Sequence, residues 1–252
     1  QVIPAALEGG DLRISAETGS GKTLAYLVPV VQRILATRAE AGAQGQAGTL
    51  ALVLVPTREL ARQVLKHCRA LLAKTPLSVH GITGGADFKY QQSLFRKNPE
   101  IIIATPGRLL EHCERGSADL RSLQTLVLDE ADRMLEMGFV EDISSIIEQT
   151  PAARQTLLFS ATYPDDIEAL SARFQKQPER ISVETMHNDQ QIDQQFFVCQ
   201  KSARLDGLVT LLNHFAPQTA VVFCNTKQLV RDVTAHLDES GIRALALHGD
   251  ME

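Results

Sequence analysis

The stretch of sequence that decides the fold is Ala16-Glu17-Thr18-Gly19-Ser20-Gly21-Lys22-Thr23. Glycines in such a stretch let the backbone turn tightly and aim its N–H groups at an anion. The pattern is close to G-x-x-x-x-G-K-[ST], with alanine in place of the first glycine. A short strand is expected before it, over residues 12–15, and a helix after it, over 24–35. The stretch therefore predicts a phosphate-binding loop, and a glycine-rich turn without a ligand is the alternative.

Two side chains of this loop have specific expected roles. The Lys22 ammonium suits the β- and γ-phosphates of a nucleotide, and the Thr23 hydroxyl suits Mg²⁺. The following helix is expected to begin near Gly21, so its positive end faces the same phosphates. We therefore expect the loop from Glu17 to Thr23 to bind a nucleotide with its magnesium ion.

A second segment, 126–132, combines an apolar strand with acidic residues and reads Leu-Val-Leu-Asp-Glu-Ala-Asp. A buried parallel strand is a continuous apolar run, and ligands bind at the carboxyl ends of such strands. We expect Asp129 to hold the Mg²⁺, partly through water, and Glu130 to orient or deprotonate an attacking water. The alternative is an acidic first turn of a solvated helix, because a helix is expected to follow.

Further short motifs follow one another in a set order along the chain. Asp-Glu-Ala-Asp at 129–132 is the signature of the DEAD-box RNA helicases, and the chain resembles that bacterial-type family over essentially its whole length. The other segments that carry the resemblance are Pro-Thr-Arg-Glu-Leu-Ala at 56–61, Gly-Gly at 84–85, Thr-Pro-Gly-Arg at 105–108, Ser-Ala-Thr at 160–162, Val-Val-Phe-Cys-Asn-Thr at 221–226 and Leu-His-Gly-Asp at 247–250.

The resemblance implies a binding surface for the sugar-phosphate backbone of RNA. Glycines permit close approach, hydroxyls and amides bind phosphate, and arginine pairs with it, so such contacts position a strand without reading its sequence. Without the resemblance, the arginines would be read as surface helix residues and the paired glycines as a turn. The residues expected to contact RNA are Pro56, Thr57, Arg58, Gly84, Gly85, Thr105, Pro106, Gly107, Arg108, Asn225, Thr226 and Gly249.

The same resemblance assigns roles around the acidic segment. Asp132 is expected in the nucleotide site, and Ser160 and Thr162 are expected to couple hydrolysis to RNA binding. We expect both hydroxyl residues to form hydrogen bonds toward segment 129–132. The alternative is a serine–threonine turn that caps the helix after Pro164. The predicted catalytic set is Lys22, Asp129, Glu130, Ser160 and Thr162.

Composition excludes several other classes of protein. The net charge of −5 over 252 residues argues against a protein that binds nucleic acid through its overall charge. Any nucleic-acid site must therefore be a local basic patch. No apolar run approaches the ~20 residues that span a membrane. The four cysteines are far apart and form no C-x-x-C pair, which favours reduced thiols in the cytoplasm over disulfides or zinc.

Apolar strands alternate with amphipathic helices, which predicts an α/β fold with a parallel sheet covered by helices on both faces. This is the RecA-like core that the resemblance implies. We expect a first RecA-like domain over 1–183, a linker over 184–192 and the N-terminal part of a second, incomplete RecA-like domain over 193–252. Residues 36–48 lack an apolar period and are predicted to be a loop. In the second domain, strands are expected over 196–199, 220–224 and 244–247, and helices over 205–214 and 228–237.

The resemblance implies an ATP-dependent RNA helicase, with ATP and Mg²⁺ as cofactors. Its expected partners are single-stranded or duplex RNA, ribosomal or mRNA complexes, and no membrane, and it is expected to be a monomer. An ATP-gated RNA clamp and a DNA-directed motor of the same superfamily remain as alternatives. The family's glutamine-bearing motif is expected before Gln1 and its later arginines beyond Glu252. We therefore expect this piece to bind nucleotide weakly and to hydrolyse it poorly.

Overall fold

The computed structural model describes residues 1–16, 19–41, 48–182 and 193–250. The chain divides into two compact units, Gln1–Met186 and His187–Glu252, and each is described by itself. The predicted linker over 184–192 lies outside the described residues. In the described part of the chain, no helix is both long and apolar enough to cross a membrane.

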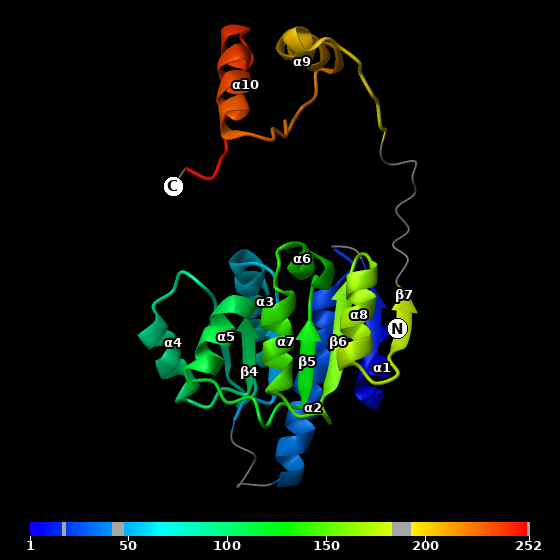
Figure 1. Ribbon diagram of the computed structural model, residues 1–252, viewed down its shortest axis with the longest axis vertical. Coiled ribbons are helices and arrows are strands. Elements are labelled where there is room, and N and C mark those ends of the chain that lie inside the picture. Colours follow the sequence, from blue (N-terminus) through cyan, green and yellow to red (C-terminus); the bar gives the residue numbers. More distant parts are fainter. Residues whose placement is uncertain (17–18, 42–47, 183–192, 251–252) are drawn as a thin grey trace. The chain divides into compact units, whose positions relative to one another are not determined.

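The first unit is built on a sheet of seven strands, and every pairing in it is parallel. Figure 1 shows the sheet between two layers of helices. Its strand order is β3-β4-β2-β5-β6-β1-β7. The strands are β1 Leu12–Ser15, β2 Ala51–Leu54, β3 Val79–Ile82, β4 Ile101–Ala104, β5 Thr125–Leu128, β6 Gln155–Ser160 and β7 Glu179–Ser182.

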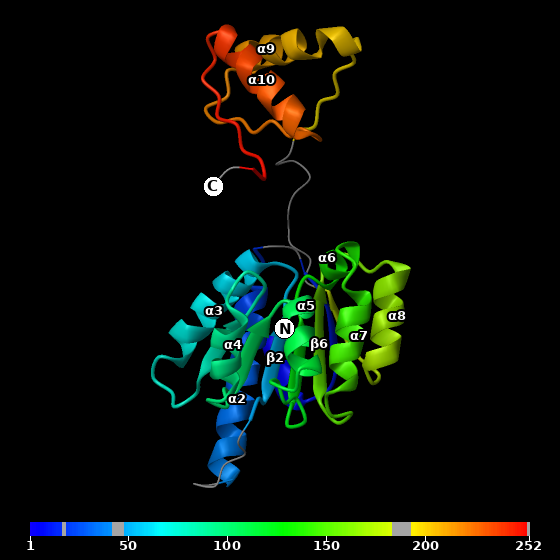
Figure 2. The same cartoon turned by 60° about the vertical axis from the view of Figure 1, so that its left-hand side comes forward.

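Helices cover both faces of this sheet, as the sequence predicted, and the second view in Figure 2 separates the two layers. Helices α1, α2 and α3 contribute to the core on one face and α4 to α8 to the core on the other. They are α1 Val2–Glu8, α2 Lys22–Ala41, α3 Arg58–Leu72, α4 Phe88–Phe95, α5 Pro106–Glu114, α6 Ala131–Glu136, α7 Val140–Glu148 and α8 Asp165–Phe174.

Strand residues contribute to the two cores alternately, because successive side chains of a strand point to opposite faces. In β2, Ala51 and Val53 face the core under α1 to α3, whereas Leu52 and Leu54 face the core under α4 to α8. All four residues of β2, β4 and β5 are buried. Burial on both faces explains why these strands appear in the sequence as uninterrupted apolar runs.

Helix α2 corrects one prediction. It continues to Ala41, so the part of the predicted loop 36–48 that precedes residue 42 is helical, and 42–47 lies outside the described residues. Alanine, arginine and glutamate are strong helix formers even where no apolar period exists. Arg38 in the last turn of α2 also forms an ion pair with Glu100, which lies beside the start of β4.

The second unit contains helices α9 (Arg204–Phe215) and α10 (Lys227–Glu239), close to the bounds predicted for them. The three predicted strands over 196–199, 220–224 and 244–247 are wrong for this structure, because residues 193–250 form no strand. A strand requires a hydrogen-bonded neighbour, and these segments do not pair with one another. Their apolar side chains remain exposed, with Phe223 at 94% and Leu245 at 98%.

Candidate active site and nucleic-acid interface

The phosphate-binding loop joins the end of β1 to the start of α2. Its described glycines, Gly19 and Gly21, have φ values of 90° and 85°, in the left-handed region that favours glycine. Helix α2 begins at Lys22, so its free N–H groups open onto the loop as the sequence predicted. Glu17 and Thr18 lie outside the described residues.

Asp129 directly follows β5 and is only 2% exposed. Its Oδ2 accepts a hydrogen bond of 2.9 Å from the hydroxyl of Tyr26 on α2. Its Oδ1 is buried and has no hydrogen-bond partner among the described residues. Burial raises the pKa of this carboxyl, and the nearby Lys22 ammonium acts in the opposite direction. A buried carboxylate oxygen without a partner is a suitable ligand for Mg²⁺ or for a water that Mg²⁺ holds.

Glu130 has φ 52° and ψ 51°, the left-handed conformation in a residue that is not glycine. Such strained backbone is concentrated at functional sites, where the surrounding structure enforces it. The Glu130 side chain is 18% exposed and lies 3.3 Å from the guanidinium of Arg133. Its carboxylate is therefore close to the surface, in contrast to the buried Asp129 that precedes it.

Asp132 joins the acidic segment to segment 160–162. Its Oδ2 accepts hydrogen bonds from the Thr162 hydroxyl at 3.1 Å, from the Thr162 N–H at 3.0 Å and from the Ala161 N–H at 3.2 Å. The Ser160 hydroxyl oxygen accepts a hydrogen bond from the Asp132 N–H at 3.3 Å. The predicted hydrogen bonds toward segment 129–132 are thus confirmed. Helix α8, by contrast, has no side-chain hydrogen bond at its Pro164 cap, so the alternative capping turn is not observed.

Ser160 also contacts the other half of the nucleotide site. Its carbonyl oxygen accepts a hydrogen bond from the N–H of Ala16, the first residue of the phosphate-binding loop, at 3.2 Å. Strand β6, which ends at Ser160, lies between β1 and β5 in the sheet. One fully buried serine therefore links the phosphate-binding loop to the acidic segment.

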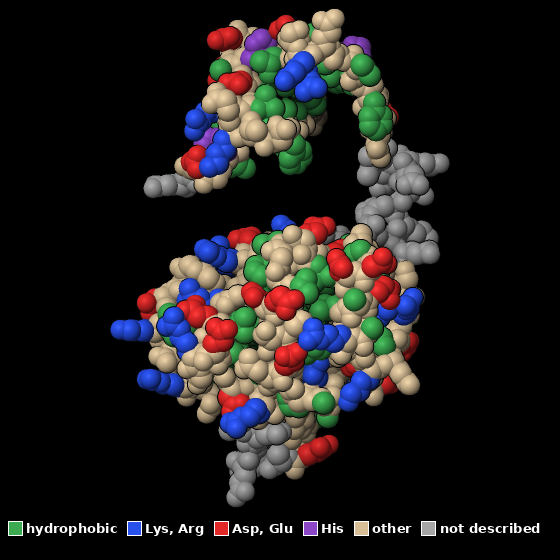
Figure 3. Space-filling view, viewed as in Figure 1, with side chains coloured by type: hydrophobic (Ala, Val, Ile, Leu, Met, Phe, Trp, Pro, Cys, Tyr) green, Lys and Arg blue, Asp and Glu red, His purple; other side chains and the backbone are tan. Residues whose placement is uncertain are grey.

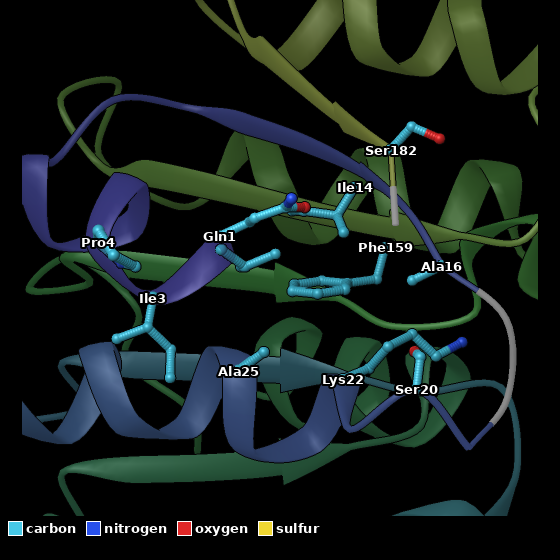
Figure 4. A pocket seen from close by; sticks show the side chains of 11 residues that line it. Gln1, Ile3, Pro4, Ile14, Ala16, Ser20, Lys22, Ala25, Phe159 and Ser182 are labelled. Carbon is cyan, nitrogen blue, oxygen red and sulfur yellow. The ribbon is translucent and has the colours of Figure 1, made fainter. Parts of the chain in front are cut away.

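A cavity of about 800 Å³ opens beside the loop. Figure 4 shows Ser20 and Lys22 at one end of it and Gln1, Ile3 and Pro4 at the other, with the Phe159 ring between them. One end thus offers a cation and backbone amides, and the other is mainly apolar. This division suits a ligand with an anionic end and a flat, less polar end.

The fit of Mg²⁺ rests on its two predicted ligands, Thr23 and Asp129. Thr23 lies in the first turn of α2, on the same helix as Tyr26. Asp129 supplies a buried oxygen that is free to accept. The described residues contain no group of three or more His, Cys, Asp or Glu that could hold a metal alone. Such a two-ligand site matches magnesium, which usually takes few protein ligands and completes its shell with water and phosphate.

The segments expected to contact RNA follow three neighbouring strands. Segment 56–58 follows β2, 84–85 follows β3 and 105–108 follows β4, and these strands are adjacent in the order β3-β4-β2. The loops predicted to bind the nucleotide follow β5, β6 and β1, the next three strands in the sheet. Both sets lie at carboxyl ends of a parallel sheet, where ligands bind in such folds.

Within the predicted RNA surface, Arg58 lies across the paired glycines. A Cβ atom on Gly85 would lie 2.3 Å from Nη1 of Arg58, so only glycine permits the observed approach. Arg108 donates a hydrogen bond of 3.0 Å to the carbonyl oxygen of Ala86, next to the same glycines. The structure thus brings Arg58, Gly84, Gly85 and Arg108 together. Acidic and basic side chains are interspersed on the face of this unit in Figure 3, consistent with a local site.

Some expected residues have local structural roles or lie in the second unit. Thr57 caps α3 through a 3.2 Å hydrogen bond from the Leu60 N–H, and Thr105 and Pro106 are buried at the start of α5. In the second unit, Thr226 caps α10, and Asn225 and Gly249 are exposed.

Comparisons with known proteins agree with this geometry. Residues 1–170 match the family described as DEAD/DEAH box helicase. The chain belongs to the DEAD/DEAH box helicase family. It is 44% identical over 251 residues to the ATP-dependent RNA helicase DbpA of Escherichia coli K12, and 41% identical over 252 residues to the ATP-dependent RNA helicase CshA of Listeria monocytogenes. These matches cover 99% and 100% of this chain, and 53% and 47% of the relatives.

A solved structure supports the same family assignment. The crystal structure of a DEAD box protein from the hyperthermophile Methanococcus jannaschii matches with a TM-score of 0.67 and 32% identity. The match covers 100% of this chain and 66% of that one. The chain therefore spans about half the length of the curated DEAD-box relatives, and the activity of a whole protein is a matter for proposal.

Sequence reasoning missed two contributors to this DEAD-box site. Tyr26 was not singled out, although it lies four residues after Lys22 and so on the same face of α2. Helix α1 was not predicted either, yet Val2, Ile3 and Pro4 line the cavity. No local signal marks α1 as part of a site, because its role depends on contacts with α2 and β1.

Proposed function

We propose that this chain is the nucleotide-binding and RNA-binding part of an ATP-dependent RNA helicase that acts in the cytoplasm. It binds ATP in the cavity beside α1 and holds RNA by its sugar-phosphate backbone. The observation that carries the proposal is the pair of adjacent sites along one sheet, with nucleotide loops after β5, β6 and β1 and cationic, glycine-bearing loops after β2, β3 and β4. Ser160 physically links the two halves of the nucleotide site.

In this proposal, the ATP phosphates lie against Lys22 and the amides of the loop that ends at Thr23. Mg²⁺ supplies charge neutralisation at the phosphates, and Thr23 and Asp129 hold it. The Tyr26 hydroxyl fixes one Asp129 oxygen so that the other faces the metal site. Glu130 orients the attacking water, and its carboxylate is partly exposed whereas that of Asp129 is buried.

RNA would contact Arg58, Gly84, Gly85, Gly107 and Arg108. These residues supply cationic side chains and backbone at which a phosphate can approach closely. Asp132 and Thr162 connect the nucleotide loops with one another, which provides a physical route by which phosphate release changes segment 160–162. In the longer protein, the second unit with Asn225, Thr226 and Gly249 would complete the RNA surface. Ribosomal or mRNA complexes are the natural substrates that we propose for a monomeric enzyme.

The test is steady-state ATP hydrolysis by the complete natural protein, with single-stranded RNA, single-stranded DNA or neither. We expect stimulation by RNA alone, and its loss in Glu130→Gln. Glu136→Gln is the matched control, because Glu136 is an exposed glutamate on the same helix α6. Equal stimulation by DNA would overturn the RNA assignment in favour of a DNA-directed motor. RNA-stimulated hydrolysis without strand separation would favour an ATP-gated clamp.

A further inference from the structure

Two buried polar side chains beneath the predicted RNA surface have no part in the site described above. His112 on α5 has no exposed surface, and Gln91 on α4 is 1% exposed. His112 Nε2 lies 3.1 Å from Gln91 Oε1, and Gln91 Nε2 donates a hydrogen bond of 2.8 Å to the carbonyl oxygen of Thr83. The pair therefore connects α5 to the residue that precedes the paired glycines.

The direction of these hydrogen bonds fixes the tautomer of the histidine. Because the Gln91 amide nitrogen donates to a carbonyl, its Oε1 must face His112 and can only accept. Nε2 of His112 therefore carries the proton. Burial lowers the pKa of His112, and the Arg108 and Arg115 guanidinium groups add to this effect against an opposing contribution from Glu111. In the neutral ring, Nδ1 carries no proton and lies 2.9 Å from the Ser117 hydroxyl oxygen, whose one proton has a second acceptor in the His112 backbone carbonyl at 3.1 Å.

An aromatic ring stacks on His112, and a cation lies against that aromatic ring in turn. Phe88, the first residue of α4, stacks on His112 with ring centroids 4.1 Å apart and an interplanar angle of 7°. The guanidinium of Arg115 lies 4.5 Å from the centroid of Phe88. Arg108, which donates to the Ala86 carbonyl, also lies 3.4 Å from Gln91 Oε1.

The carbonyl groups on both sides of the paired glycines are thus held by side chains of one network. Thr83, before the glycines, is held by Gln91, and Ala86, after them, is held by Arg108. Two glycines in series are otherwise the most conformationally free backbone that a chain can offer. Fixing the two flanking carbonyls removes most of this freedom before any ligand arrives, and preorganisation of this kind increases affinity.

We propose that Gln91 and His112 are positioning residues that hold loop 83–86 against the start of α5. The two segments proposed to contact RNA, 84–85 and 105–108, then face the same stretch of RNA backbone. The proposal rests on the proposed function, because it concerns the same RNA surface. Neither residue touches the RNA. Their effect is to fix the spacing between the paired glycines and Arg108.

The test compares three variants of this chain. Gln91→Leu removes its side-chain hydrogen bonds to Thr83, His112 and Arg108. His112→Phe retains a ring that can stack on Phe88. Gln175→Leu is the matched control. Gln175 is similarly buried, at 8% exposed, and its amide donates two hydrogen bonds of 2.9 Å. Its acceptors are the carbonyls of Leu12 and Thr156, on β1 and β6 in the other half of the sheet.

Two quantities are measured for each variant. The first is hydrogen exchange of the amides in loop 83–87, which we expect to accelerate by about tenfold in Gln91→Leu and His112→Phe but not in the control. The second is the anisotropy of a short fluorescein-labelled oligouridine, titrated at low salt with a non-hydrolysable ATP analogue. The dissociation constant for this RNA should rise by about fivefold in the same two variants, while the affinity for the analogue is unchanged.

Three results would overturn the positioning role. They are unchanged exchange in loop 83–87, unchanged RNA affinity despite faster exchange, or an equal loss of RNA affinity in Gln175→Leu, which would assign the effect to general destabilisation. A different result identifies failure of the proposed function itself. If the complete natural protein binds the nucleotide analogue but no RNA, the proposed RNA surface is wrong, and the role given to Gln91 and His112 falls with it.

Discussion

Substitution of Gly85 by alanine provides a sharp test of the proposed RNA surface, because its neighbour Gly84 serves as the control. Gly85 has φ +80°, a region that costs a non-glycine residue about 1–2 kcal/mol. Alanine recovers about 0.4–1 kcal/mol by restricting the unfolded chain. The free energy of unfolding should therefore fall by about 1 kcal/mol, or about 2–4 °C in the melting temperature of a domain of this size.

The second consequence of Gly85→Ala concerns Arg58. The new Cβ would lie 2.3 Å from Nη1 and 2.9 Å from Cζ of this side chain. These atoms are at the far end of a flexible chain, so the clash is relieved when the guanidinium moves, at little cost in stability. RNA affinity should then fall about as far as in Arg58→Ala, and the double variant should show little further loss.

Gly84→Ala places its Cβ no closer than 3.4 Å to Arg58, and no positive φ opposes it. We expect it to keep stability and to lower RNA affinity by less than Gly85→Ala does. The measurements are urea unfolding and anisotropy of labelled single-stranded RNA. Equal effects of the two alanines, or full additivity of Gly85→Ala with Arg58→Ala, would refute the reasoning that Gly85 influences RNA affinity through the position of Arg58.

Three other predictions concern the same domain. Burial raises the pKa of Cys68 to about 12 and of Cys113 to about 11. Ellman's reagent at pH 8 should therefore label the exposed Cys199 and leave these two thiols unmodified until the chain unfolds. Rapid reaction of all the thiols would contradict the burial of Cys68 and Cys113. Because the folded-state pKa of His112 is lowered, the unfolded chain binds the proton more readily, and stability should fall as the pH drops below about 6.5. His112→Phe should reduce the pH dependence of the free energy of unfolding, measured with urea between about pH 7 and 5, by at most about 1.4 kcal/mol per pH unit. An unchanged pH dependence would argue against a neutral ring. Thr162→Val removes the 3.1 Å hydrogen bond to the Asp132 carboxylate. The free energy of unfolding should fall by less than about 1 kcal/mol, whereas RNA-stimulated ATP hydrolysis by the complete protein should fall about tenfold. An unaltered rate of hydrolysis would remove this threonine from the coupling route.

The sequence predicted those features that depend on neighbours along the chain. Helix α3 is of this kind, because Thr57 caps it and its apolar residues recur at helical spacing. Strands β3 and β4 are each bounded by polar or turn-forming residues, which mark their ends in the sequence. The left-handed glycines of the phosphate-binding loop follow from the loop pattern itself.

Features that depend on distant residues could not be predicted in this way. The roles of Tyr26, Gln91 and His112 require partners that lie far away in the sequence or on another helix. The exposed apolar segments around Phe223 and Leu245 were read as strands because their composition is that of buried strands. Whether such a segment forms a strand depends on a pairing partner, which composition does not reveal.

The strand order has a consequence for how this protein is made. Strand β1, which leads into the phosphate-binding loop, pairs with β6 and β7, the last two strands of the sheet to be synthesised. Leu12 pairs with Leu157, so at about 5–20 residues per second a ribosome needs roughly 7–30 s between making the two partners. During that interval β2 to β5 can assemble along the growing chain, while β1 has no neighbour to pair with. The first strand of this sheet to be synthesised is thus among the last to become ordered, and the ability to bind nucleotide should appear only when synthesis of the sheet is almost complete.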